Sequence, residues 1–431
     1  MIYRFRWVCC QLGILRHCFP PSVRRILEEL PDSLDETYER ILREIRKPNQ
    51  GLAHRLMQCL VAAARPLEVK ELAEILAFDF NTEGIPKLNQ NWRWEDQEEA
   101  VVSACSSLIT IVNHGDSRIV QFSHFSVKEF LTADRLVEPI RDVSCYHIEL
   151  EAAHTMLAQA CIGVLLRFDD QVDRDNIKEF PLAPYAAEYW PSHAKFRSVS
   201  ARITGGMKCL FDEDKPHFAT WLWIYKGTTT MRPEKPGAVP LHHATRLGFR
   251  DLVVHLIAEH PEHVNAKDDS ERTAMHTATK GGNTDIVSLL LEHGADVDSL
   301  DGGDWTSLHW ASSRGRLGAG KCLLDHGADI NARDLDEWTP LYVCVGSTSE
   351  GRVEFAQMLL ERGAVVDARD DRGRTSLHRA VKGGKIQFVR LLLEHGADVN
   401  ACDKSGKTPS QYTTRQDILE LLSGYGAEVV K

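Results

Sequence analysis

The chain has 431 residues, of which 43% are hydrophobic and 26% charged, and its formal net charge is −11 at pH 7. A chain of this length usually folds into two or three domains. The acidic charge argues against general nucleic-acid binding, which needs a basic surface to neutralise phosphates. No run approaches the ~20 apolar residues of a membrane span, and the 11 dispersed cysteines lack zinc-type spacing. We therefore expect no membrane span, no metal and no nucleic-acid partner, in a cytoplasmic or nuclear protein with reduced thiols.

The first third of the chain is expected to be helical. Residues 22–47 predict a pair of helices broken near Pro31, because Leu34, Tyr38 and Leu42 follow that proline at helical spacing. We assign residues 1–50 to this helical segment. Further helices are predicted at 52–64, 68–77 and 95–106.

Two short strands are predicted next. The apolar runs 108–112 and 119–122 flank the turn residues 113–117, which is the pattern of a β-hairpin. A last helix is expected at 124–136. Three helices and a hairpin are typical of a winged helix, which we place at 51–137.

Many winged helices bind DNA through one of their helices. Here the candidate recognition helix, residues 95–102, contains four acidic side chains, Glu95, Asp96, Glu98 and Glu99, and no basic residue. Phosphate groups would repel such a helix, which argues against DNA binding by this domain.

The C-terminal half contains an internal repeat. A motif of the form Thr-Pro-Leu-His, with variants, begins at residues 239, 273, 306, 339, 375 and 408, so the spacings by subtraction are 34, 33, 33, 36 and 33. We assign the three extra residues of the fourth repeat to 345–351, before its first helix ends. Thr favours a helix N-cap and Pro the first helical position.

Each repeat is expected to continue with a second helix and a turn. Glycines should close the first helices in the left-handed conformation. An apolar run such as 286–293 then predicts the second helix, and Gly294-Ala295-Asp296 leads into the turn. The glycines concerned are Gly248, Gly282, Gly315, Gly351 and Gly384.

These two motifs in phase resemble the ankyrin repeat, whose period is about 33 residues. The resemblance covers 237–431 and implies six stacked repeats with projecting β-hairpins, the first and last acting as caps. The fold class is therefore mostly α: a helical and winged-helix N-terminal part, followed by an ankyrin-repeat α-solenoid with β-hairpin tips.

Three stretches upstream of the repeats resemble fungal NOD-like receptor proteins with a NACHT domain. Residues 30–38 are similar to the segment after their nucleotide-binding domain. Residues 122–131 are similar to their winged-helix domain of the GPI inositol-deacylase type, and 185–194 to the helical linker that follows it, which we place at 138–228. The resemblance implies a signal-transducing ATPase whose nucleotide-binding domain lies upstream of this chain. It implies no deacylase chemistry.

Two motifs suggest an enzyme but do not predict one. Gly315 to Cys322 resembles a phosphate-binding loop, yet Cys322 replaces the required Ser or Thr, and a helix rather than a strand is expected before it. The recurrent histidines His242, His276 and His309, with His378, are structural in the ankyrin family, where they bridge the backbone and the Thr hydroxyl. We therefore predict no catalytic residue, no cofactor and no bound nucleotide.

Partners of ankyrin repeats usually dock on the hairpin tips and on the concave face. Trp305 and Trp338 occupy equivalent tip positions in adjacent repeats, where stacking should place them side by side, and Trp and Arg are common binding hot spots. The alternative is that each indole covers its neighbour's hairpin. The predicted tip residues are Arg272, Trp305, Trp338, Arg374 and Lys407.

A row of basic residues is predicted near the ends of the first helices. It could steer an acidic partner towards the array, or it could be a solvated helix face, because acidic residues at the tips weaken its field. The residues of this row are Arg246, Lys280, Arg314 and Lys382.

The function that these features favour is a non-enzymatic protein-interaction module, the ligand-sensing or regulatory part of a NOD-like receptor type protein. One alternative is the C-terminal part of an ATP-driven switch whose NTPase is encoded upstream. A second alternative is a substrate adaptor.

Overall fold

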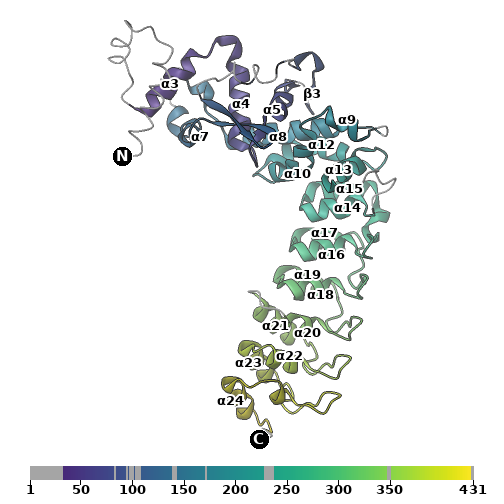
Figure 1. Cartoon of the computed structure of the whole chain (residues 1–431). Coiled ribbons are helices and arrows are strands. Elements are labelled where there is room, and N and C mark those ends of the chain that lie inside the picture. The colour runs from purple at the N-terminus through teal and green to yellow at the C-terminus, as the bar shows by residue number, and fades with distance from the viewer. Residues whose placement is uncertain are drawn as a thin grey trace. The chain divides into compact units, whose positions relative to one another are not determined.

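The computed structural model describes residues 33–81, 84–93, 96, 101, 108–137, 143–169, 172–227, 237–346 and 351–428. The chain divides into two compact units, Met1–Glu234 and Lys235–Lys431. In the described ranges, no helix is long and apolar enough to cross a membrane. Figure 1 draws both units, and each is described by itself.

The described part of the N-terminal unit begins with three α-helices. Ser33 caps the first of them, since its side chain accepts a hydrogen bond from the Glu36 N–H. Glu68 and Glu71 form a reciprocal capping box at the start of the third. These elements are α3 (Leu34–Glu44), η2 (Lys47–Asn49), α4 (Gln50–Ala62) and α5 (Val69–Leu76).

A small antiparallel sheet follows. β4 (Ile109–His114) and β5 (Ser117–Phe122) form the expected hairpin, but its turn contains only Gly115 and Asp116, because His114 pairs with Ser117. Gly115 has a φ of +61°, a conformation that glycine adopts without strain. The sequence did not predict β1 (Leu67–Glu68), which pairs with β5 and gives the order β1-β5-β4.

The remaining elements of this region are short. β2 (Phe78–Asp79) pairs with β3 (Lys87–Leu88), and η3 (Gln90–Trp92) follows them. α7 (Phe125–Leu131) ends five residues before the predicted boundary, and η4 (Asp134–Val137) takes its place. The acidic helix predicted at 95–106 falls almost entirely outside the described residues.

α3 packs on α7. The Tyr38 hydroxyl lies 2.8 Å from the Ser126 hydroxyl, and the rings of Tyr38 and Phe130 are 5.4 Å apart. Tyr38 is buried to 2% exposure, so this contact is part of a core. The helix that we placed in the segment 1–50 thus contributes to the packing of the winged-helix region.

Helices fill the rest of the N-terminal unit. Trp190 lies at the centre of their core, with rings 6.1 Å from Phe211 and 5.5 Å from Trp221, and the indole of Trp221 donates to the Ala187 carbonyl at 2.9 Å. The elements are η5 (Ser144–Tyr146), α8 (Leu150–Leu165), α9 (Arg174–Lys178), α10 (Ala183–Ala194), α11 (Val199–Arg202), α12 (Thr204–Leu210) and α13 (His217–Lys226).

Six pairs of helices form the second unit, and each pair stacks on the next, as Figure 1 shows from α14 to α24. Loops between the pairs project to one side of the stack. The first elements of the pairs are α14 (Pro240–Leu247), α16 (Ala274–Gly281), α18 (Ser307–Arg314), α20 (Pro340–Val345), α22 (Ser376–Lys382) and η7 (Pro409–Tyr412). The second helices are α15 (Arg250–Glu259), α17 (Thr284–Glu292), α19 (Leu317–Asp325), α21 (Arg352–Glu361), α23 (Ile386–Glu394) and α24 (Gln416–Gly424), and η6 (Pro261–Asn265) follows α15.

A threonine and a histidine begin three of the six first helices, as the sequence predicts. Thr306 is the N-cap of α18, and His309 accepts a hydrogen bond at Nδ1 from the Thr306 N–H (3.2 Å). The other ring nitrogen, Nε2, donates to the Trp338 carbonyl of the next repeat (2.9 Å). His276 and His378 make the same two contacts in their repeats. These histidines therefore join neighbouring repeats.

The fourth repeat departs from this pattern. α20 ends at Val345 and its C-cap is Gly346 in a right-handed conformation, so the three extra residues follow the first helix and our placement of them inside it was wrong. Gly351 has a φ of +79°, but it precedes α21 as its N-cap and does not close α20. Residues 347–350 lie outside the described ranges.

The segment that resembles a phosphate-binding loop forms ordinary repeat structure. Gly315 closes α18 with a φ of +64°, and the residues after Arg316 belong to α19. A Cβ on Gly320 would lie 2.5 Å from the Phe355 ring, so this glycine permits the close packing of α19 on α21.

Candidate functional site

An aspartate shapes each of the five hairpin loops. Its Oδ1 accepts the N–H groups two and four residues later, as Asp301 does from Gly303 (2.9 Å) and Trp305 (3.0 Å). Such a carboxylate closes the turn with backbone donors that would otherwise face water. The five residues are Asp268, Asp301, Asp334, Asp370 and Asp403.

The second oxygen of each aspartate holds an aromatic or arginine side chain. Trp310 donates from Nε1 to Asp301 Oδ2 (2.9 Å), and Trp305 donates to Asp334 Oδ2 of the next loop (2.8 Å). The hydroxyl of Tyr342 donates to Asp370 Oδ2 at 2.8 Å. Large rings are therefore fixed on the face formed by the first helices and the hairpin loops, which we call the inner face.

Trp305 and Trp338 each pair with an aromatic ring of the helix that follows them. The Trp305 ring pairs with Trp310, 5.1 Å away, and the Trp338 ring pairs with Tyr342, 5.5 Å away. The hydrogen bond to Asp334 also joins the Trp305 indole to the loop that contains Trp338. Both tryptophans are half-buried.

Trp338 has a free polar group. Arg379 places its guanidinium carbon 4.4 Å above the Trp338 ring and 4.5 Å from that of Tyr342, a cation–π contact with two rings. The Trp338 Nε1–H is buried without a hydrogen-bond partner. Leu335, three residues earlier in the same loop, is 70% exposed. The exposed Leu335 side chain and the half-buried Trp338 ring thus lie in one loop.

The predicted tip cations differ in how they are held. Arg272 pairs with Asp268 at 3.1 Å and Arg374 with Asp370 at 2.7 Å, so each forms an ion pair with the aspartate of its own loop. Lys407 is exposed, and its Nζ lies 5.9 Å from the centre of the Tyr412 ring. The two arginines are engaged within the chain, and Lys407 remains accessible.

The predicted basic row is partly in contact with these rings. Lys280 Nζ lies 4.5 Å from the centre of the Trp310 ring. Burial lowers the pKa of Lys280, and the nearby Arg272 and Arg314 add to this effect. The side chain of Arg246 bonds to His243 Nδ1 at 2.7 Å. Arg246, Arg314 and Lys382 are exposed.

Several inner-face residues were not predicted. Trp310, Arg379 and Tyr412 each lie four positions after the N-cap of their repeat, at Thr306, Thr375 and Thr408. Aligning the repeats by their caps would have shown aromatic and basic residues at this one position.

Three of the loops contain a strained acidic residue. Glu271, Asp304 and Glu337 occupy the fourth loop position with φ values of 58°, 56° and 62°, where the last two loops have Gly373 and Gly406. Non-glycine residues adopt this left-handed conformation at an energetic cost. The first three loops therefore present a carboxylate where glycine would be more stable.

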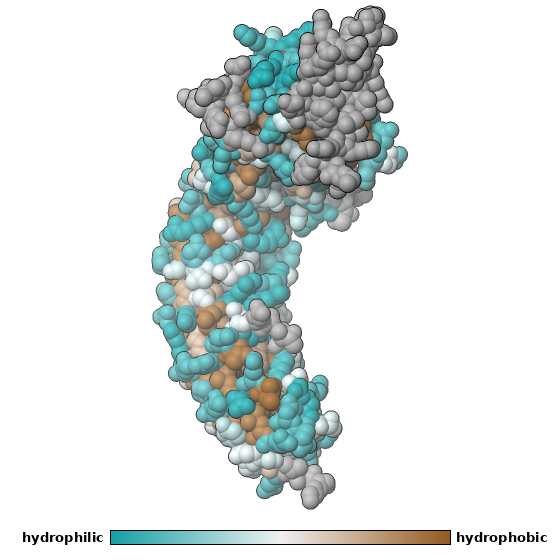
Figure 2. Space-filling view, turned by 90° about the vertical axis from the view of Figure 1, so that its left-hand side faces the viewer, coloured by the Kyte–Doolittle hydropathy of each residue, from teal (hydrophilic) through white to brown (hydrophobic). Residues whose placement is uncertain are grey.

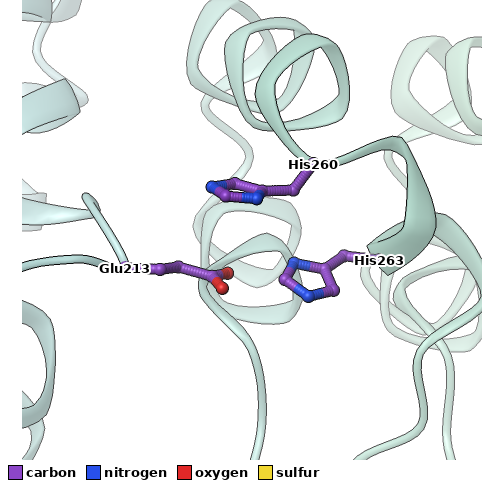
Figure 3. Close-up of side chains that lie close together, drawn as sticks. All are labelled: Glu213, His260 and His263. Carbon is purple, nitrogen blue, oxygen red and sulfur yellow. The ribbon is translucent and has the colours of Figure 1, made fainter.

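Two histidines after α15 also lie close together. Figure 3 shows His260 and His263, whose rings stack with their centres 5.2 Å apart. Two imidazoles are fewer than the three or four ligands of a typical protein zinc site. Glu213, drawn in the same figure, belongs to the other unit, and the positions of the two units relative to one another are not determined.

The side of the repeats that faces the viewer in Figure 2 is a mixed surface. Hydrophilic residues surround separate hydrophobic areas along the array in this view. Single exposed apolar residues of this kind are normal on protein surfaces.

Comparison with known proteins agrees with this architecture. Residues 241–334, 303–370 and 346–431 match the family of ankyrin repeats in three copies. Residues 38–140 match the winged-helix domain of GPI inositol-deacylase.

Two individual proteins are similar to parts of the chain. The azaphilone pigments biosynthesis cluster protein L of Monascus ruber is 34% identical over 280 residues, an alignment that covers 60% of this chain and 58% of that protein. The ankyrin repeat domain of Bcl-3, described as a unique member of the IkappaB protein family, matches with a TM-score of 0.42 and 31% identity over 45% of this chain and 89% of that one. The chain thus contains ankyrin repeats that follow a winged-helix domain of the GPI inositol-deacylase type.

Proposed function

We propose that the inner face of the ankyrin array binds a protein partner, with Leu335, Trp338 and Arg379 at the centre of the contact. The observation that supports this most is the arrangement around Trp338. An exposed leucine, an indole with an unused N–H and a guanidinium stacked on that indole lie together in one loop and the helix beside it.

Energetic reasons favour this place. Trp and Arg contribute most often to binding hot spots. The Trp338 ring is already held between Tyr342 and Arg379, so little side-chain entropy is lost when a partner covers it. Lys280 on Trp310 extends the same surface into the neighbouring repeats.

A finer role follows from the order of the domains. We propose that the chain is the sensing or regulatory part of a cytoplasmic signalling protein of the NOD-like receptor type, in which the repeats recognise a ligand. The winged-helix match upstream of the repeats supports this order of domains. The relative from Monascus ruber, named as a biosynthesis cluster protein, supports a fungal setting.

The experiment uses photo-crosslinking at two positions. A photoreactive amino acid replaces Leu335 in one protein and Val254 of the second helix α15, which is 38% exposed, in the other. We expect a partner protein to crosslink at position 335 and not at 254. Equal crosslinking at both positions, or none at 335, would contradict the proposal.

Affinity for the identified partner then provides a matched comparison. We expect Leu335→Ser to weaken binding by about fivefold or more, because the apolar side chain that the partner would cover is lost, and Val254→Ser to leave it unchanged. Leu335 is 70% exposed, so neither change should lower the melting temperature.

A further inference from the structure

Four basic side chains from three repeats converge at the end of α20. The guanidinium of Arg379 lies against Gly346, because a Cβ on that glycine would overlap its Nη2 atom. Lys385 donates from Nζ to the Val345 carbonyl at 2.7 Å. Arg352 donates from Nη2 to the Ser313 carbonyl of the third repeat, beside Arg314.

Two of these arginines have buried donors without acceptors. Arg352 is only 5% exposed, yet its Nε and Nη1 groups make no hydrogen bond, and Nη1 of Arg379 is also buried and unpaired. Leaving a charged donor buried and unpaired is costly, so native proteins almost always supply an acceptor. The missing partner is therefore expected to come from outside the described chain.

The carboxylates near Arg379 are already engaged. Asp334 accepts from Trp305 and from two backbone N–H groups, and Asp370 accepts from Tyr342 and Arg374. In the ranges that the structure describes, neither Arg352 nor Arg379 forms an ion pair, whereas Arg272 and Arg374 do. The negative charges of Asp334 and Asp370 still act on Arg379, but neither arginine has an ion-pair partner among these residues.

The pKa directions agree with crowded positive charge. Burial lowers the pKa of Lys385, and Arg379 and Arg352 lower it further. Burial also lowers the pKa of Arg352, to which the neighbouring Arg314 contributes. An anion bound here would accept hydrogen bonds from the unpaired donors, and its negative charge would offset the repulsion between the cations.

A purely structural role explains only part of Arg352. Its bond to Ser313 satisfies a carbonyl at the C-terminal end of α18, where a positive charge is favourable. That bond uses Nη2 alone. The Nε and Nη1 groups remain without partners.

We propose that Arg314, Arg352, Arg379 and Lys385 bind a phosphate monoester carried by the protein partner, as in a phosphoserine or phosphothreonine side chain. Arginine donors match the oxygens of phosphate and carboxylate alike. A phosphate monoester carries a charge of about −1.5 to −2 at neutral pH, so it interacts with neighbouring arginines more strongly than one carboxylate does. This inference rests on the proposed partner binding and names the chemistry of one subsite.

The test measures binding of free O-phosphoserine to the full chain by calorimetry at constant ionic strength, with serine and glutamate as the other ligands. We expect phosphoserine to bind, serine not to bind, and glutamate to bind at least about fivefold more weakly, since it carries one charge and one carboxylate for this site. Equal affinity for glutamate and phosphoserine would overturn the phosphate assignment. If phosphoserine does not bind at all, the proposal that these four residues form a binding site is wrong.

Matched variants locate the site. Arg379→Gln is expected to weaken phosphoserine binding at least about tenfold, because it removes both a charge and a buried donor. Arg246→Gln, at an exposed arginine of the first repeat, should leave the affinity unchanged. An equal loss in both variants would mean general electrostatic attraction and would overturn the proposal. Because Arg379 also stacks on Trp338, the melting temperatures of both variants are measured as a control for folding. Arg379→Lys keeps the positive charge and should therefore retain part of the phosphoserine affinity.

A variant of Glu350 tests whether the chain itself supplies the acceptor. This carboxylate lies close in sequence but outside the described residues. We expect Glu350→Gln to leave the stability unchanged or to raise the phosphoserine affinity. The opposite result has two parts: Glu350→Gln lowers the melting temperature, and the parent chain does not bind phosphoserine. In that case Glu350 is the acceptor for the arginine N–H groups, and the proposal is wrong. These measurements need no partner protein, so they can fail while the crosslinking at position 335 succeeds.

Discussion

The third and fourth repeats have the same plan but use their polar groups differently. In the third, both nitrogens of His309 are bonded, Gly315 closes α18 in the left-handed conformation, and the polar contacts pass directly to the next repeat. In the fourth, Tyr342 replaces the histidine and bonds to Asp370. α20 is shortened to six residues, and Arg352 follows with unpaired donors.

The difference shows where a repeat protein can place function. The recurring histidines His276, His309 and His378 satisfy both ring nitrogens within the array, and this makes them structural. Arg352 and Arg379, which depart from the repeat, have buried hydrogen-bond donors without partners. Local rules are commonly broken at functional sites, since the cost of a broken rule is offset when a ligand binds.

The largest expected effect tests the structural side of this comparison. His309→Ala should lower the unfolding free energy by about 3 kcal/mol, because the Thr306 N–H and the Trp338 carbonyl lose a buried partner and a cavity forms. Urea denaturation followed by circular dichroism measures the change. Tyr342→Phe is the matched variant in the fourth repeat, where the loss of one hydroxyl bond should cost about 1 kcal/mol. Equal losses would show that the two repeats do not differ as described.

The second prediction concerns pH. Burial lowers the pKa of His276, His309 and His378 in the folded chain below the ordinary value of 6.5. Above that pH, these rings are neutral in both states. Below it, the unfolded chain binds protons that the folded array resists, since Nδ1 already accepts a hydrogen bond, so stability should fall as the pH drops from about 7 to 5.

Hydrogen exchange resolved by segment measures this effect within the array. Tyr342→His introduces a fourth such ring and should steepen the loss of protection around α20 and α22. If protection from exchange in the array is the same at pH 7 and at pH 5, protonation of these histidines does not lower the stability of the array, and the prediction is wrong.

The smallest expected effect concerns loop strain. Asp304→Gly should raise the unfolding free energy by about 0.5 kcal/mol, because glycine adopts the left-handed conformation freely, while its more flexible unfolded chain offsets part of the gain. Gly373→Ala is the matched variant in the loop after the fourth repeat. It should destabilise, since φ is +75° and a Cβ would lie 3.0 Å from the Lys404 nitrogen. A destabilising Asp304→Gly would show that this aspartate contributes a contact of its own.

Local patterns predicted much of this fold. The Thr caps, the structural histidines and the 33-residue period depend on contacts within one repeat or between neighbours, and a recurring motif therefore shows them in the sequence. The hairpin of the winged helix was predicted for a similar reason, because its strands are adjacent in the chain. Its third strand, β1, was missed since it pairs with β5 across some fifty residues.

The inner face required the tertiary structure. Trp305 and Trp338 stand out in the sequence, but only the structure shows that Trp305 bonds to Asp334 and that the two rings pair with Trp310 and Tyr342. Arg352 and Arg379 lie 27 positions apart in the sequence, counted from their numbers. Their shared surroundings and their unpaired donors arise because stacking brings three repeats together at the end of α20, and burial and hydrogen-bond satisfaction depend on which groups finally meet.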